Sequence, residues 1–237
     1  MKNSFSIIIP ILNEKKNIPV IVKKIKSSLR NYTYEVIFVD DDSNDGTNEV
    51  LNFLSKKYSN IKYLIRKNKT KDLSQSCHDG IKKAIYNLII IMDGDLQHDP
   101  KDIKNLLYEY NKKNLNLVIA ARNFKKKILG MSLFRVFFSI LLIKLISIFF
   151  KNKTRDPMSG YFLIEKKFFM KNRHRYFLKG YKILADIIYN SKSKINSKDV
   201  IINFQKRIYG KSKMSFKILL ILIYFLINNK IKKAFNS

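Results

Sequence analysis

Short apolar runs alternate with amphipathic stretches over the first half of the chain, and this alternation limits the possible folds more than any other feature. The apolar runs have the length, β-branched content and bounding turn residues of strands, and the amphipathic stretches have the spacing of helices. The expected strands cover residues 6–11, 34–39, 61–65, the run that ends at 93, and 117–121, and the expected helices cover 17–29, 47–58, 73–86 and a segment that begins near 100. This order predicts an α/β fold with a mostly parallel central sheet, and no linker or repeat divides it.

Two carboxylates stand at the end of one of these strands. The apolar run 89–92 is followed by Asp93, Gly94 and Asp95, and Gln97 comes two positions later. The carboxyl ends of strands are where open α/β sheets bind their ligands. Oxygen ligands at this spacing suit a hard divalent cation, Mg²⁺ or Mn²⁺, that also contacts phosphate. A solvated acidic turn between a strand and a helix is the simpler alternative.

Two further polar segments, 10–14 and 40–47, follow the first and second expected strands. Parallel strands end at the same edge of a sheet, so we expect both segments to lie near Asp93 and Asp95. Acidic side chains are poor phosphate partners but good acceptors for base imino groups and ribose hydroxyls. The alternative for the second segment is a turn at Asp45–Gly46 followed by a capped helix.

The charge balance points to a polyanionic partner. The chain of 237 residues has 47 Lys and Arg against 18 Asp and Glu, a formal net charge of +29. Nucleic acid and an anionic membrane both fit this excess, and a codon bias towards A and T would also produce it. We expect no nucleic-acid partner, because acidic residues collect at the strand ends where a basic stripe would be needed. The single Cys77 excludes an internal disulfide and fits a reducing cytoplasm.

Two apolar segments in the second half suggest contact with a membrane surface. Residues 131–150 are nearly all apolar, but Ser132, Arg135 and Ser139 share one helical face, as in an amphipathic helix at a membrane interface. A core helix whose arginine pairs with a carboxylate is the alternative. The run 218–227 is too short to span a bilayer and has lysines on both sides. We expect 216–237 to form an anchor helix, with packing on the domain as the alternative.

Several of these segments together resemble a known family. The resemblance covers roughly residues 4 to 215, which we expect to form one catalytic domain, and it is carried by the segments 10–14, 40–47, 92–100, 156–161 and 207–214 with Arg122, Arg135 and Ser139. In this order they resemble the polyprenyl-phosphate (dolichyl-phosphate) mannosyltransferases among the inverting family 2 glycosyltransferases. The segments 156–160 and 207–213 point most narrowly to this group. The resemblance implies a glycosyltransferase A-type, Rossmann-like fold.

The resemblance also implies roles for individual residues. The donor nucleotide would be bound by Pro10, Asn13, Glu14, Asp40, Asp41 and Asp93. The divalent cation would be held by Asp93, Asp95 and Gln97. The residues that act on the reacting phosphates would be Asp95, Arg122, Arg135, Ser139, Arg207 and Lys213. Among these, Arg135 and Ser139 would bind the lipid phosphate, and Arg207 and Lys213 would close over the site.

Three positions depart from the usual pattern of that family. Leu12 stands where an aromatic residue is usual beside the base, and Asp42 stands where glycine or asparagine is frequent. Asp72, in the segment 71–74, replaces the glycine of the common Arg-Gly-Leu-Ser. None of the three is a proposed metal ligand, so the departures concern the donor base and the shape of the donor loop.

The implied reaction is metal-dependent transfer of a hexose to a polyprenyl monophosphate, with inversion at the anomeric carbon. Mannose from GDP-mannose is the favoured donor, and a UDP-glucose-dependent glucosyltransferase or another family 2 enzyme is the alternative. The acceptor phosphate is ionised near neutral pH, so a dedicated general base is optional. The lipid acceptor and the basic, apolar segments lead us to expect a peripheral or monotopic protein on the cytoplasmic face of a membrane, resting on its anionic surface.

Overall fold

The computed structural model describes residues 4–112, 114–123, 154–180 and 183–209. The expected interfacial helix 131–150 and anchor helix 216–237 lie outside these residues, and so do Arg135, Ser139 and Lys213. Within the described part of the chain, no helix is both long and apolar enough to cross a membrane.

The expected strands and helices of the first half are all present, with boundaries shifted by a few residues. The strands are β1 (Phe5–Ile11), β2 (Tyr34–Asp40), β3 (Ile61–Ile65), β4 (Leu88–Ile91), β5 (Leu117–Arg122), β6 (Phe162–Glu165) and β7 (Ser197–Ile202). The helices are α1 (Asn17–Ser28), α2 (Thr47–Lys57), α3 (Leu73–Lys83), α4 (Ile103–Lys112), α6 (Lys166–Asn172) and α7 (Ile183–Asn190), with short 3-10 turns at Pro100–Asp102 (η1) and Arg173–Arg175 (η2).

All these strands form one sheet in the order β3-β2-β1-β4-β6-β5-β7. The pairs β1–β2, β1–β4, β2–β3 and β5–β7 are parallel, which confirms the expected mostly parallel sheet. β6 is inserted between β4 and β5 and runs antiparallel to both. The sequence analysis did not foresee β6 or β7.

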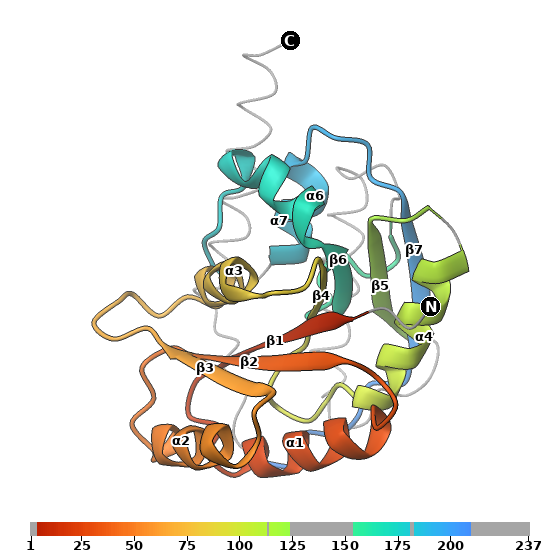
Figure 1. Ribbon diagram of the computed structural model, residues 1–237. Coiled ribbons are helices and arrows are strands. Elements are labelled where there is room, and N and C mark those ends of the chain that lie inside the picture. The colour runs from red at the N-terminus through yellow and green to blue at the C-terminus, as the bar shows by residue number, and fades with distance from the viewer. Residues whose placement is uncertain (1–3, 113, 124–153, 181–182, 210–237) are drawn as a thin grey trace.

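Helices cover both faces of the sheet (Figure 1): α1, α2 and α4 lie on one side, and α3, α6 and α7 lie on the other. Successive residues of a strand point to opposite faces, so Ile7 and Ile9 pack on the first side and Ile8 on the second. β1 and β4 are buried on both faces, and their sequences are therefore nearly continuous apolar runs rather than alternating ones. α3 approaches so closely that a Cβ at Gly80 would collide with the side chain of Ile8.

The carboxyl ends of β1 to β4 form one edge of the sheet, and an unusual backbone conformation recurs there. Each strand is followed by a non-glycine residue in the left-handed region: Asn13 (φ 54°), Asp42 (φ 63°), Asn68 (φ 56°) and Leu96 (φ 66°). Asn and Asp tolerate this conformation better than most other side chains, so Asp42 suits its position after β2. Leu is poorly suited to it, and such strain is typical of functional loops.

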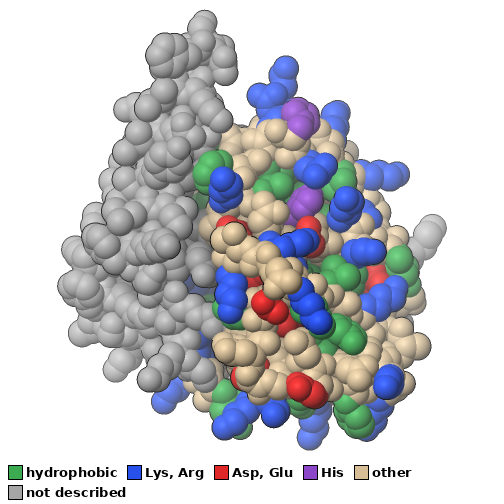
Figure 2. Space-filling view, turned by 90° about the vertical axis from the view of Figure 1, so that its left-hand side faces the viewer, with side chains coloured by type: hydrophobic (Ala, Val, Ile, Leu, Met, Phe, Trp, Pro, Cys, Tyr) green, Lys and Arg blue, Asp and Glu red, His purple; other side chains and the backbone are tan. Residues whose placement is uncertain are grey.

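Charged side chains are unevenly placed on the surface. On the face drawn in Figure 2, Lys and Arg side chains spread over the described part of the molecule, while Asp and Glu gather nearer its middle. Along the chain, Asp40 and Asp41 stand at the end of β2 and Asp93 and Asp95 follow β4, so acidic groups do collect at strand ends.

Candidate active site

The loops after β1 and β2 are bonded to each other. The Asn13 N–H donates to Ser43 Oγ (2.7 Å), and the Asn44 N–H donates to Asn13 Oδ1 (3.0 Å). Ser43 in turn donates its N–H (3.0 Å) and its hydroxyl to the carboxylate of Asp40. Asp40 is fully buried, and burial raises its pKa even though the bonds from Ser43 lower it. The structure therefore brings Asn13 and Asp40 together, in a rigid frame.

Glu14 and Pro10 belong to the same frame. The Glu14 N–H donates to Thr47 Oγ1 (3.2 Å) at the start of α2, and the Asn17 side-chain amide donates to the Glu14 carboxylate. Pro10 lies buried inside β1, and Glu14 is only 8% exposed. These predicted nucleotide-binding residues all lie at or just beyond the carboxyl end of β1.

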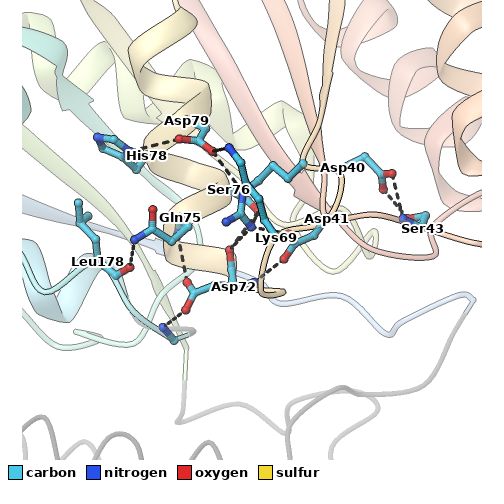
Figure 3. A network of polar contacts seen from close by, with 12 residues as sticks. Asp40, Asp41, Ser43, Lys69, Asp72, Gln75, Ser76, His78, Asp79 and Leu178 are labelled. Atoms are coloured by element: carbon cyan, nitrogen blue, oxygen red, sulfur yellow. Dashed lines mark hydrogen bonds and ion pairs between the residues drawn. The ribbon is translucent and has the colours of Figure 1, made fainter.

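Asp41 has a partner that the sequence analysis missed. The buried guanidinium of Arg66, directly after β3, forms an ion pair with Asp41, and the Asp72 N–H donates to the same carboxylate (network in Figure 3). Burial raises the pKa of Asp41, and the positive charge of Arg66 opposes that shift. The sequence did contain a signal for this pair. Asp41 directly follows β2 and Arg66 directly follows the neighbouring parallel strand β3, so both lie at the same edge of the sheet.

Asp95, Gln97 and Arg207 meet at the end of β4. The Gln97 N–H donates to Asp95 Oδ1 (3.1 Å), and Leu96 between them has the left-handed backbone. The Arg207 guanidinium forms an ion pair with Asp95 and donates to Gln97 Oε1 (3.4 Å). Gln205 holds this segment in place, because its N–H donates to the Gln97 carbonyl (2.9 Å) and its carbonyl accepts from the Gln97 side chain (3.2 Å). The structure thus brings the predicted Arg207 onto the acidic pair.

Asp93 is the more open of the two carboxylates, with a third of its side chain exposed. Its N–H donates to Nδ1 of His98 (3.3 Å), a buried residue that the sequence analysis did not assign to the site. The His98 ring packs on Tyr161 and Phe204, at 5.0 and 5.4 Å between ring centroids. Below Asp93 lies Gly160, where a Cβ would come within 2.6 Å of Asp93 Oδ1 and 2.7 Å of its Cγ. Glycine is therefore required here if Asp93 is to keep its position.

Arg122 is bound by the segment that contains Gly160. Its Nε and Nη2 donate to the two oxygens of Asp156 at 2.7 and 2.8 Å, a bidentate pair in which Asp156 is fully buried. Burial alone would lower the pKa of Arg122, but the Asp156 carboxylate outweighs burial and raises it. Ser159 Oγ donates to the Ala120 carbonyl (2.7 Å), so the segment is fixed to β5 at two points. Arg122 is the last residue of β5, and Asp156 sets the orientation of its side chain.

Comparison with known proteins now identifies the family. Residues 6–173 match the family model described as glycosyl transferase family 2. The chain belongs to glycosyl transferase family 2. The expected family is thereby confirmed.

Two curated relatives of this family 2 chain are dolichol-phosphate mannosyltransferases. The protein from Pyrococcus furiosus is 33% identical over 216 residues, which are 90% of this chain and 59% of that relative. The protein from Mycosarcoma maydis is 29% identical over 231 residues, 91% of this chain and 75% of the relative. The chain thus spans well under two thirds of the archaeal protein's length.

A solved structure shares the fold of this family 2 chain. Glucosyl-3-phosphoglycerate synthase from Mycobacterium tuberculosis, crystallised with Mn²⁺, UDP-glucose and phosphoglyceric acid, has a TM-score of 0.71 over 97% of this chain and 79% of that one. Only 13% of residues are identical, so the likeness concerns the fold.

The acidic pair of this family 2 domain suits a metal bound together with its substrate. Within the described ranges, no group of three or more His, Cys, Asp and Glu residues is arranged to hold a metal ion by itself. Mg²⁺ in phosphate sites, however, is bound through one or two carboxylates, with the remaining ligands from water and substrate phosphates. Asp93 and Asp95 meet that requirement, and Arg207 already contacts one of the two.

Proposed function

We propose that this chain transfers a hexose, preferably mannose from GDP-mannose, to the monophosphate of a polyprenyl lipid, with inversion at the anomeric carbon. The observation that carries the proposal is the contact of Arg207 with Asp95 and Gln97. It places a guanidinium group, which can bind phosphate, next to two of the candidate metal ligands. The two relatives named dolichol-phosphate mannosyltransferase support the lipid acceptor and the mannose donor.

The two sides of the donor would be bound at different parts of the edge. The exposed Asn13 and the buried Glu14 and Asp40 offer preorganised acceptors for the base and ribose, with Pro10 in β1 and Asp41 directly after β2. Asp93, Asp95 and Gln97 would hold Mg²⁺ or Mn²⁺, which when bound supplies positive charge to the departing diphosphate. That a structural neighbour of the same fold was solved with Mn²⁺ and UDP-glucose is consistent with this arrangement.

The cationic residues would bring two anionic reactants together. A lipid-phosphate oxygen attacks the anomeric carbon, the bond from that carbon to the donor diphosphate breaks, and the nucleoside diphosphate leaves. The attacking oxygen is already ionised, so no protein group has to remove a proton. Arg122 would approach the donor phosphates, and Arg135 with Ser139 would bind the acceptor phosphate. Arg207 and Lys213 would close over the site and neutralise phosphate charge. Attack from the side opposite the leaving group inverts the anomeric centre.

A lipid acceptor requires the site to lie at a membrane. We propose that the segments 131–150 and 216–237 rest on the cytoplasmic leaflet and that the positive charge of the chain adds attraction to anionic headgroups. Each surface Lys or Arg contributes about 1 kcal/mol to such binding. The net charge of +29 would then hold the protein at the anionic membrane surface, where the lipid acceptor lies.

The test is sugar transfer by the purified full chain. The protein is incubated with polyprenyl phosphate, Mg²⁺ or Mn²⁺, and labelled GDP-mannose or UDP-glucose in parallel. We expect label from GDP-mannose in the lipid phase, loss of the product on chelation, and recovery when metal is restored. Asp95→Ala should reduce the rate at least about 100-fold, since it removes a carboxylate that would hold the cation neutralising the leaving diphosphate.

The control variant is Glu109→Gln. It removes a carboxylate on α4 that forms an ion pair with Lys112, one helical turn further along. This variant should keep full activity. Product from UDP-glucose alone would retain the acceptor and overturn the mannose donor. Absence of a lipid product with every nucleotide sugar, from a folded protein, would overturn the proposed function.

A further inference from the structure

The side chain of Asp72 contacts two separate parts of the chain. Asp72 is the N-cap of α3, where its Oδ1 accepts the Gln75 N–H at 3.1 Å. Its Oδ2 accepts the Gly180 N–H at 2.6 Å. Its own N–H donates to the carboxylate of Asp41. One residue therefore connects the start of α3, the loop after β2 and a segment more than a hundred positions away.

The distant segment, Leu178–Gly180, includes a leucine in a backbone conformation that leucine rarely adopts. Leu178 (φ 50°) and Gly180 (φ 86°) are both left-handed. From α3, Ser74 donates its N–H and hydroxyl to the Gly180 carbonyl (2.9 and 2.8 Å), and Gln75 Nε2 donates to the Leu178 carbonyl (2.7 Å). From α7, Asp186 accepts the Leu178 N–H (2.8 Å). Side chains from two helices thus determine the path of this segment.

The segment is linked to the donor edge through Asp72. The Asp41 N–H donates to the carbonyl of Ile11 (3.0 Å), so Asp41 is fixed at the ends of β1 and β2. In Figure 3 the contacts run from Asp41 through Asp72 to Gln75 and Leu178, all along one side of the start of α3. Asp72 thus links Asp41 to Gly180 through two hydrogen bonds.

The charge of Asp72 is satisfied within this network. An extra carboxylate near a donor diphosphate would ordinarily repel it, but both Asp72 oxygens accept backbone N–H groups, and one of these belongs to the positively polarised first turn of α3. Arg66 adds a buried positive charge beside Asp41 and also pairs with Asp79 (3.2 Å). Both carboxylate oxygens of Asp72 therefore have hydrogen-bond donors within the protein.

We propose that Asp72 is a positioning residue of the donor site, whose carboxylate ties Leu178–Gly180 to the start of α3 and so fixes the wall of the nucleotide pocket beside Asp41. The proposal rests on the proposed function for the nature of the ligand, a nucleoside diphosphate. The tie itself is a contact between two described residues.

Two variants separate the tie from the helix cap. Asp72→Ser keeps a side chain that can cap α3, but serine is too short to reach the Gly180 N–H. Asp72→Gly loses the side-chain contacts with both the Gln75 N–H and the Gly180 N–H. In Asp72→Ser we expect the Gly180 amide to exchange with solvent about tenfold faster or more, because a hydrogen bond to a charged group is lost. We expect KM for the donor and Kd for GDP or UDP with Mg²⁺, by calorimetry, to rise about tenfold with kcat retained, the pattern of lost ground-state binding.

The control is Glu35→Gln at the opposite end of β2, which removes a buried carboxylate bonded to Ser6 and to the Ile85 N–H. It should lower the melting temperature and leave both KM and Gly180 exchange unchanged. Wild-type exchange at Gly180 in Asp72→Ser, or faster exchange with unchanged nucleotide binding, would overturn the proposal. If the wild type bound neither GDP nor UDP and transferred no sugar, the proposed function would fail, whereas Gly180 exchange would still report on the tie.

Discussion

At the scale of single residues, the space under Asp93 is the most sensitive point of the site. The φ angle of Gly160 is not in the left-handed region, so alanine fits the backbone conformation. The added methyl group, however, would lie within 2.7 Å of the Asp93 carboxyl carbon. We predict that Gly160→Ala turns Asp93 away and lowers kcat about 100-fold, as small displacements of catalytic groups do, with little change in stability. Steady-state rates over a series of Mn²⁺ concentrations, with thermal melting, measure both effects.

A double variant identifies the cause. Because Gly160→Ala is expected to act through Asp93, adding it to Asp93→Asn should reduce the rate no further. Independent, multiplying losses would show that Gly160 matters for another reason.

At the scale of secondary-structure elements, Glu35 joins three strands and the end of a helix far from the candidate site. This buried residue accepts bonds from Ser6 of β1 (2.6 Å), Lys62 of β3 (2.8 Å) and the Ile85 N–H after α3 (2.7 Å). Burial would raise the pKa of Glu35, but these bonds and the charge of Lys62 outweigh it and bring the pKa below 4.5.

The sign of the pH dependence follows from this lowered pKa. The folded state binds the Glu35 proton more weakly than the unfolded state, so the ionised group stabilises the fold above about pH 4.5, and this stability is lost as the pH falls through the folded pKa. We predict that Glu35→Gln lowers the free energy of unfolding by roughly 1–3 kcal/mol at pH 7 and by clearly less at pH 3. Urea unfolding at both pH values tests this, and an equal loss at both would contradict it.

At the scale of the whole molecule, the net charge of +29 should govern binding to membranes. We predict that the full chain cosediments with phosphatidylserine-containing vesicles at about 0.1 M salt and is largely released at about 1 M, because the screening length falls from about 10 Å to about 3 Å. Neutral phosphatidylcholine vesicles are the control. Equal, salt-independent binding to both would assign the interaction to apolar segments alone.

Local sequence determined much of this molecule. The run 6–11 is short, apolar and rich in β-branched residues, so it favours a strand. Polar residues that follow parallel strands share one edge of the sheet. That reasoning placed Asn13, Asp40, Asp93 and Asp95 at the candidate site. It failed for β6, a strand of four residues whose antiparallel pairing with β4 and β5 has no local periodic signal.

Tertiary structure alone decided which of these side chains meet. The pairing of Arg66 with Asp41 and of Arg207 with Asp95, the tie from Asp72 to Gly180, and the position of Gly160 beneath Asp93 each join distant parts of the chain. Periodicity reports the face and edge on which a residue lies, because it reflects the geometry of one element. Partners depend on how several elements pack together, and that arrangement is set by burial across both faces of the sheet.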